Sequence, residues 1–73
     1  MKLPRDLSGI KLIKIMSKFG WIVHRRQGSH ITLKKNASPE IITIPVHTSI
    51  ATGTLLGILR KAKIDREEFQ KHL

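Results

Sequence analysis

Apolar residues in the first part of the chain recur at the spacing of an α-helix. Ser8 is a typical N-cap residue, and Gly20 is typical of the position just beyond a helix end. The apolar positions between them share one helical face: Leu12, Ile13, Met16 and Phe19. The lysines fall on another face: Lys11, Lys14 and Lys18. The pattern therefore predicts an amphipathic helix that begins at Ser8 and ends at Gly20.

From Trp21 onward the period of the apolar positions changes to two, which is typical of β-strands. Short turns at residues 27–28 and 36–39 divide the region into three strands. The predicted strands are residues 21–25, 30–34 and 41–44. Pro45 cannot donate a hydrogen bond from mid-sheet, so it closes the third strand or lies at an edge. Three strands joined by short turns make an antiparallel meander.

The second strand has two chemically different sides. Ile31 and Leu33 alternate with His30, Thr32 and Lys34. We expect the two apolar side chains to face the helices and the three polar ones to face away from them.

Helical spacing returns after the third strand. Several hydroxyls between Ser49 and Thr54 could cap a second helix. Its apolar side comprises Leu55, Leu56, Ile58, Leu59 and Ala62. A short third helix should begin at Asp65, because Asp65 with Glu68 fits a capping box, and Ile64 with Phe69 fits a hydrophobic staple.

The order of these elements predicts an α+β fold, in which helices cover one face of a three-stranded antiparallel sheet. A length of 73 residues allows a single domain, residues 1–73. The chain has no cysteine, which excludes disulfides and thiolate sites. No apolar run approaches the roughly 20 residues that span a bilayer. We therefore expect a cytoplasmic protein that does not contact a membrane.

The charge of the chain is strongly positive and uneven. Lys and Arg number 14 against five Asp and Glu, a net charge of +9. Residues 1–35 carry nine cations and only one acid, whereas residues 36–73 carry five cations and four acids. Such an asymmetry favours a polyanionic partner such as nucleic acid or an acidic protein.

Residues 25–35, RRQGSHITLKK, place one histidine between two pairs of cations. A histidine beside phosphate-binding charge can act as a general acid or base near neutral pH. The sequence has no P-loop, no HExxH motif and no carboxylate pair suited to glycoside chemistry. On the residues alone His30 is a candidate catalytic residue, and a structural or incidental histidine on a solvated hairpin remains the alternative. The polyanion-binding candidates are Arg25, Arg26, Gly28, Ser29, Lys34 and Lys35.

Nearly the full length of the chain resembles the HicA family of toxin ribonucleases, also called YcfA-like proteins. The motifs that carry this resemblance are LPRDLSG at residues 3–9, GSH at 28–30, IPVH at 44–47, GTLLGIL at 53–59 and IDREEF at 64–69. The resemblance implies a fold similar to the double-stranded-RNA-binding domain. It also implies an endoribonuclease that cleaves mRNA, with the GSH histidine, His30 here, as the catalytic residue.

The resemblance further implies a HicB-type antitoxin that binds and silences the toxin. No cofactor or metal ion is needed for such cleavage, because RNA carries its own nucleophile, the 2′-OH. Two other functions stay open on the residues alone. One is a non-catalytic RNA-binding module, and the other is a domain whose basic surface meets an acidic protein.

Overall fold

The computed structural model describes residues 7–47 and 49–73, so residues 3–6 of the opening motif lie outside it. The elements in chain order are α1 (Gly9–Ser17), β1 (Trp21–Gln27), β2 (His30–Lys35), β3 (Ile41–Pro45), α2 (Thr52–Ala62) and α3 (Arg66–Gln70). This order confirms the predicted α+β fold, and it is consistent with the architecture of double-stranded-RNA-binding domains.

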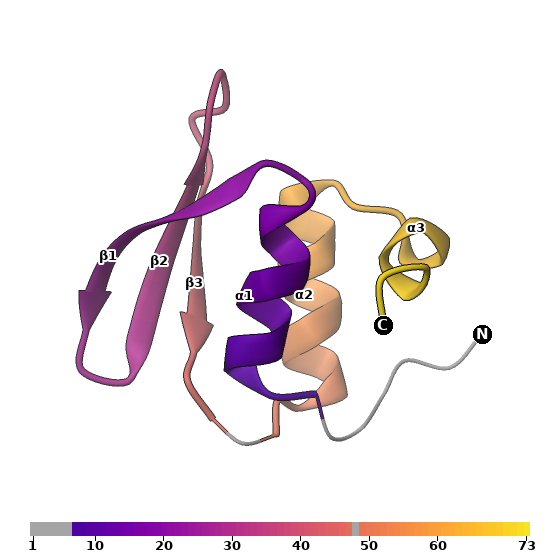
Figure 1. Ribbon diagram of the computed structural model, residues 1–73, viewed down its shortest axis with the longest axis horizontal. Coiled ribbons are helices and arrows are strands. Elements are labelled where there is room, and N and C mark those ends of the chain that lie inside the picture. Colours follow the sequence, from indigo (N-terminus) through magenta and orange to yellow (C-terminus); the bar gives the residue numbers. More distant parts are fainter. Residues whose placement is uncertain (1–6, 48) are drawn as a thin grey trace.

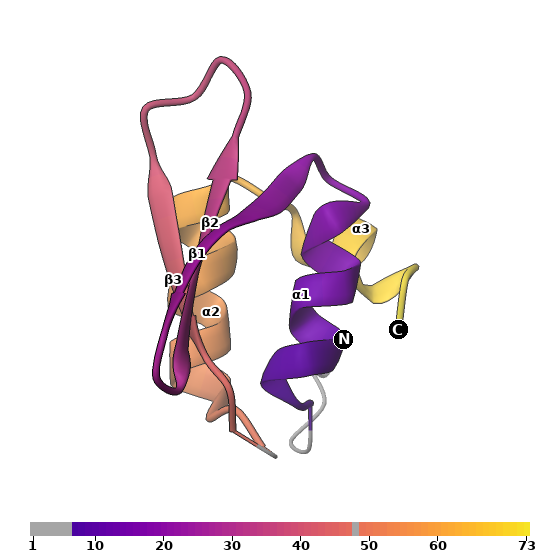
Figure 2. The ribbon, with the colours of Figure 1, turned by 60° about the vertical axis from the view of Figure 1, so that its left-hand side comes forward.

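The molecule has two layers (Figure 1). Helices α1 and α2 pack side by side against one face of the sheet, and Figure 2 shows that no described element covers the other face. Among the described residues, fifteen buried apolar side chains form one core. Thirteen come from the sheet and the three helices, and Leu7 and Ile50 come from the segments before α1 and α2. The largest of the core side chains are Trp21, Phe69, Leu12, Met16 and Leu33. The sheet therefore has one buried face and one open face.

Strand β2 is the central strand, with β1 and β3 antiparallel on either side. Ile31 and Leu33 on β2 lie opposite Ile44 and Ile42 on β3, and all four are buried. The alternation predicted for this strand is thereby confirmed, with His30 on the open face.

Strand β1 contains a β-bulge at His24, between Val23 and Arg25. Because His24 is an extra residue in the ladder, Arg25 pairs with Thr32 and comes to lie on the open face. Arg26 is then on the side that faces the helices. The bulge thus decides which face each arginine takes: Arg25 the open face and Arg26 the face toward the helices.

The ends of two helices bear on the capping predictions. The Ser8 hydroxyl accepts a hydrogen bond from the Lys11 backbone N–H at 3.1 Å, so the predicted N-cap of α1 forms. The N-cap residue of α2 is Ala51, which makes no side-chain hydrogen bond. The helix begins at Thr52, within the predicted range, but an alanine and not a hydroxyl residue occupies the N-cap position.

Helix α3 begins where the sequence predicted, but its capping box does not form. Asp65 occupies the N-cap position without a side-chain hydrogen bond. The Glu68 carboxylate instead lies 3.1 Å from the Lys71 ammonium, one turn further along the helix. In an exposed helix this i, i+3 ion pair competes with the cap for the same carboxylate.

Candidate functional site

His30 lies at the exposed start of β2, directly after the turn at Gly28 and Ser29. Its neighbours across the sheet are Gln27 on β1 and Pro45 on β3. Gly28 has a φ of 57°, a left-handed conformation that suits glycine in a tight hairpin turn. The turn therefore presents His30 at one end of the open face, next to the small residues Gly28 and Ser29.

Hydrogen bonds hold this turn from both sides. On one side, the Val46 N–H donates to the Ser29 carbonyl at 2.6 Å. On the other, the Arg26 Nε–H donates to the Gly28 carbonyl at 3.3 Å. The backbone before His30 is thus positioned by β1 and by the segment after β3.

The start of α1 supports the same corner. The Gly9 N–H donates to the His47 carbonyl at 2.9 Å. A Cβ atom at Gly9 would collide with the Pro45 carbonyl oxygen, so only glycine allows so close an approach. Pro45 is the cross-strand neighbour of His30, so this contact with α1 fixes the end of the sheet at which His30 lies.

Arg25 is the predicted cation nearest to His30 on the open face. It pairs with Thr32, two residues along β2 from His30, which makes Arg25 a diagonal neighbour of His30. Such neighbours are about 7–8 Å apart, within reach of a long side chain. Both residues are exposed, and no carboxylate in the part of the chain that the structure describes pairs with Arg25. A phosphate beside His30 could therefore also contact the Arg25 guanidinium.

The other predicted cations lie further away. Lys34 is on the open face four residues along β2 from His30, roughly 13 Å at the rise of a strand. Lys35 pairs with Trp21, on the side that faces the helices. Arg26 pairs with Ile31 on that same side, and its side chain is hydrogen-bonded to the Gly28 carbonyl. The predicted set thus divides into three parts. Arg25, Gly28, Ser29 and His30 form a cluster, Arg26 lies at the same end of the sheet on the other face, and Lys34 and Lys35 lie at the far end.

Three polar residues near His30 were not assigned a role from the sequence. Gln27 faces His30 directly across the hairpin. His24 forms the bulge, and His47 follows the residue whose N–H holds the turn. The position of Gln27 opposite His30 could have been predicted by counting back across a two-residue turn. No sequence signal predicts the bulge at His24.

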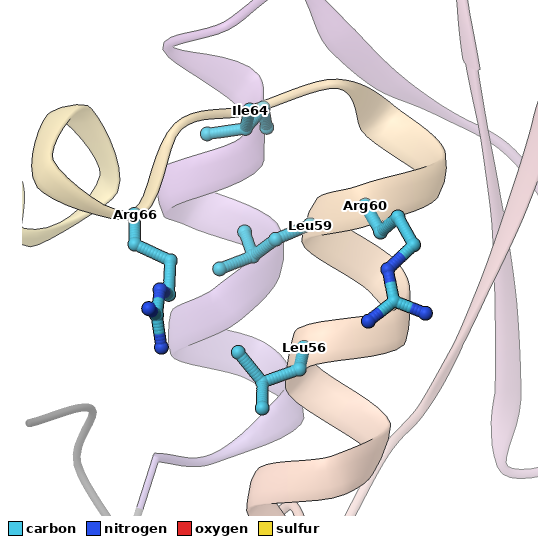
Figure 3. A pocket seen from close by; sticks show the side chains of 5 residues that line it. All are labelled: Leu56, Leu59, Arg60, Ile64 and Arg66. Carbon is cyan, nitrogen blue, oxygen red and sulfur yellow. The ribbon is translucent and has the colours of Figure 1, made fainter.

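The hollow between α2 and α3 is a weaker candidate. It has a volume of about 340 Å³ and is lined by Leu56, Leu59, Arg60, Ile64 and Arg66 (Figure 3). Leu56 and Leu59 project from α2 on the side where Arg66 lies. None of its lining residues is a histidine or an acid, so it offers no group for acid–base chemistry. Across residues 7–47 and 49–73, no three histidines or acids gather as a metal site.

The fold and the site define a small α+β protein with an open, cationic sheet face and an outward histidine at its edge. The family model described as HicA toxin of bacterial toxin–antitoxin matches residues 9–64, which is more than half of the chain. The protein therefore belongs to the HicA toxin family. A toxin of this kind has an antitoxin as its partner. No curated protein matches the chain.

None of the described helices is long and apolar enough to cross a membrane. The matched segment ends at Ile64, immediately before α3.

Proposed function

We propose that this toxin is an endoribonuclease, an mRNA interferase that cleaves RNA without a metal ion. The observation that carries the proposal is the position of His30, exposed on the open sheet face with Arg25 as its diagonal neighbour. The proposed domain comprises residues 1–73 and acts in the cytoplasm, where mRNA is found.

In the proposed reaction, the 2′-OH of a ribose attacks the adjacent phosphorus. His30 removes the proton of this hydroxyl as a general base, or protonates the leaving 5′-oxygen as a general acid. The bond between phosphorus and the 5′-oxygen breaks. The products are one strand with a 2′,3′-cyclic phosphate and one with a free 5′-hydroxyl, so no water is consumed in this step.

The surrounding residues have distinct roles in this proposal. The Arg25 guanidinium would bind the phosphate oxygens, where negative charge increases in the transition state. Gly28 and Ser29 let the RNA backbone approach the turn, because they put little bulk beside His30. Arg26, Lys34 and Lys35 would contact phosphates further along the strand.

The proposal predicts that cleavage depends on a 2′-OH and not on divalent cations. A labelled RNA should be cut in excess EDTA, and the same RNA with 2′-deoxy sugars at the cut positions should bind but stay intact. Gel analysis should show 2′,3′-cyclic phosphate ends. Cleavage of the deoxy strand, or 5′-phosphate ends, would contradict this mechanism. Binding of both strands without any cut would favour a non-catalytic RNA-binding module.

We also propose that a HicB-type antitoxin covers the open face. Ile22 and Ile41 are 58% and 44% exposed, and they flank Lys34 in one cross-strand row. An apolar pair with a cation between them fits a partner that carries apolar and acidic side chains. Such a partner would also cover His30, on the same face.

This docking surface predicts that Ile22→Ala combined with Ile41→Ala weakens binding of the co-expressed antitoxin by about tenfold or more, roughly 1.4 kcal/mol. Ile10→Ala is the matched control, because Ile10 is 51% exposed but lies on α1. Calorimetry on the purified proteins would measure both effects. An equal loss of affinity in the control, or an antitoxin that binds while cleavage continues, would refute this placement.

A further inference from the structure

A second hollow lies at the end of the sheet away from His30. It is formed by the turn between β2 and β3 (residues 36–40), by Trp21 at the start of β1 and by the carboxyl end of α2, and its volume is about 450 Å³. Figure 1 shows this turn and the β1–β2 turn at opposite ends of the sheet. Lys35, on its wall, is five residues along β2 from His30, or roughly 17 Å.

Trp21 in the wall of this hollow carries an unsatisfied hydrogen-bond donor. The side chain is 2% exposed, and its Nε1 is buried without a hydrogen-bond partner. Buried polar atoms are nearly always partnered, and an indole N–H can only donate. The missing partner is therefore an acceptor. The Nε1 atom itself has almost no accessible surface, so an anion or a water molecule in the hollow would reach it only after a small shift of the surrounding side chains.

The charge around the hollow favours an anion. Lys35, Lys61 and Lys63 line it, against the single carboxylate of Glu40. None of the three ammonium groups is in an ion pair with a carboxylate within residues 7–47 and 49–73. These lysines come from the sheet and from the end of α2, so folding gathers them at the hollow that Trp21 also lines.

We propose that this hollow binds a phosphate group, with the three ammonium groups around it and the Trp21 N–H as a hydrogen-bond donor. As a source of the phosphate we assign the RNA backbone, which rests on the proposed function. An RNA whose reacting phosphate lies at His30 would then have a second anchor roughly 17 Å away along β2. Because Lys35 and Trp21 lie on the side that faces the helices, the strand would pass around the end of the sheet to reach it. The hollow takes no part in the chemical step, and its role is to hold the substrate.

The chain provides its own probe for this site, because Trp21 is its only tryptophan. In a proton–nitrogen correlation spectrum of the labelled protein, one indole N–H signal reports on the hollow. Inorganic phosphate should shift this signal downfield in a saturable way, whereas chloride at equal ionic strength should not.

The test variant combines Lys61→Gln with Lys63→Asn. Lys63 has a φ of 58°, and asparagine tolerates this left-handed conformation better than most residues. The matched control, Lys11→Gln with Lys14→Gln, removes the same charge from α1. We expect the test variant to bind phosphate at least tenfold more weakly than the control. Equal weakening in both would mean that only overall charge matters, and would overturn the site.

A second arm identifies the source of the phosphate. A single-stranded RNA is added to the His30→Ala protein, in which the RNA should stay intact. The RNA should shift the indole signal, and the Lys61→Gln, Lys63→Asn changes should weaken its binding at least tenfold. A shift with inorganic phosphate but not with RNA would overturn the RNA anchor and leave a site for free phosphate. No shift with either would mean that water satisfies Trp21, which overturns the proposal.

Cleavage of RNA by the wild type, measured in parallel, separates this inference from the proposed function. If the wild type cleaves RNA but RNA does not shift the indole N–H signal, the phosphate site in the hollow is overturned and the proposed nuclease is not. An indole response to RNA without any cleavage would overturn the nuclease alone.

Discussion

Replacement of His30 by alanine is expected to abolish RNA cleavage while the protein stays folded. General acid–base catalysis contributes roughly 10²–10⁴-fold, so the rate should fall by at least about 100-fold. His30 is exposed and has no part in the core, so the free energy of unfolding should change by no more than about 0.5 kcal/mol. RNA should still bind, because every cation of the hairpin remains. Single-turnover cleavage and urea unfolding measure the two effects.

The matched control for this experiment is His24→Ala. His24 is also exposed, lies on the same hairpin and occupies the bulge rather than the start of β2. We expect its loss to leave most of the cleavage rate. If the His30 variant cuts at the wild-type rate, or unfolds, then His30 is a structural residue. If both variants lose activity equally, the catalytic assignment extends to His24.

Replacement of Phe69 by alanine is expected to lower the free energy of unfolding by about 3–5 kcal/mol. Phe69 is fully buried in the core, although it lies in α3, a helix of only five residues. A domain of this length is stable by roughly 4–11 kcal/mol in total, so the substitution removes a large fraction of that. Chemical denaturation followed by circular dichroism would measure the change.

Glu67→Ala provides the control in the same helix, because Glu67 is exposed and should shift stability by no more than about 0.5 kcal/mol. A similar small change for Phe69→Ala would mean that α3 merely lies against the surface. The expected large loss would instead make α3 part of the domain, although the family match ends at Ile64. That result would support a single domain through residue 73.

The period of the apolar residues was enough to predict the architecture. Burial of Ile31 and Leu33 against the helices follows directly from alternation, and so does the outward position of His30. The turn at Gly28 was predicted to within one residue, because glycine before a strand is a local signal, although Gln27 belongs to β1 and the turn residues are Gly28 and Ser29. What alternation predicts well is therefore the central strand, which has a neighbour on each side.

The edge strand was less predictable. Strict alternation from Trp21 puts Arg25 and Arg26 on the wrong faces, because it does not count the extra residue at His24. That bulge depends on how β1 twists against its partner strand. Nothing in the local sequence marks that position. The separation of Arg25 from Lys34 along the open face likewise required the register of the ladder.

Contacts between distant segments were beyond reach from the sequence. The sheet and α2 must pack before one hollow is lined by Trp21, Lys35 and Lys63. No sequence motif therefore predicts this hollow. The capping box at Asp65 failed for a related reason, since Lys71 offers Glu68 a competing partner. Local patterns predict which groups are available, but competition among them is decided by the folded geometry.

The bulge in β1 also bears on how the toxin behaves at high concentration. Strand β1 is an edge of the sheet, and flat edges of this kind can pair with the edge of another copy and seed aggregates. The bulge at His24 interrupts the regular ladder, and Arg25 and Arg26 put positive charge on both sides of the same edge. Two copies that approach edge to edge would repel each other. The hairpin that presents His30 is thereby also protected against self-assembly.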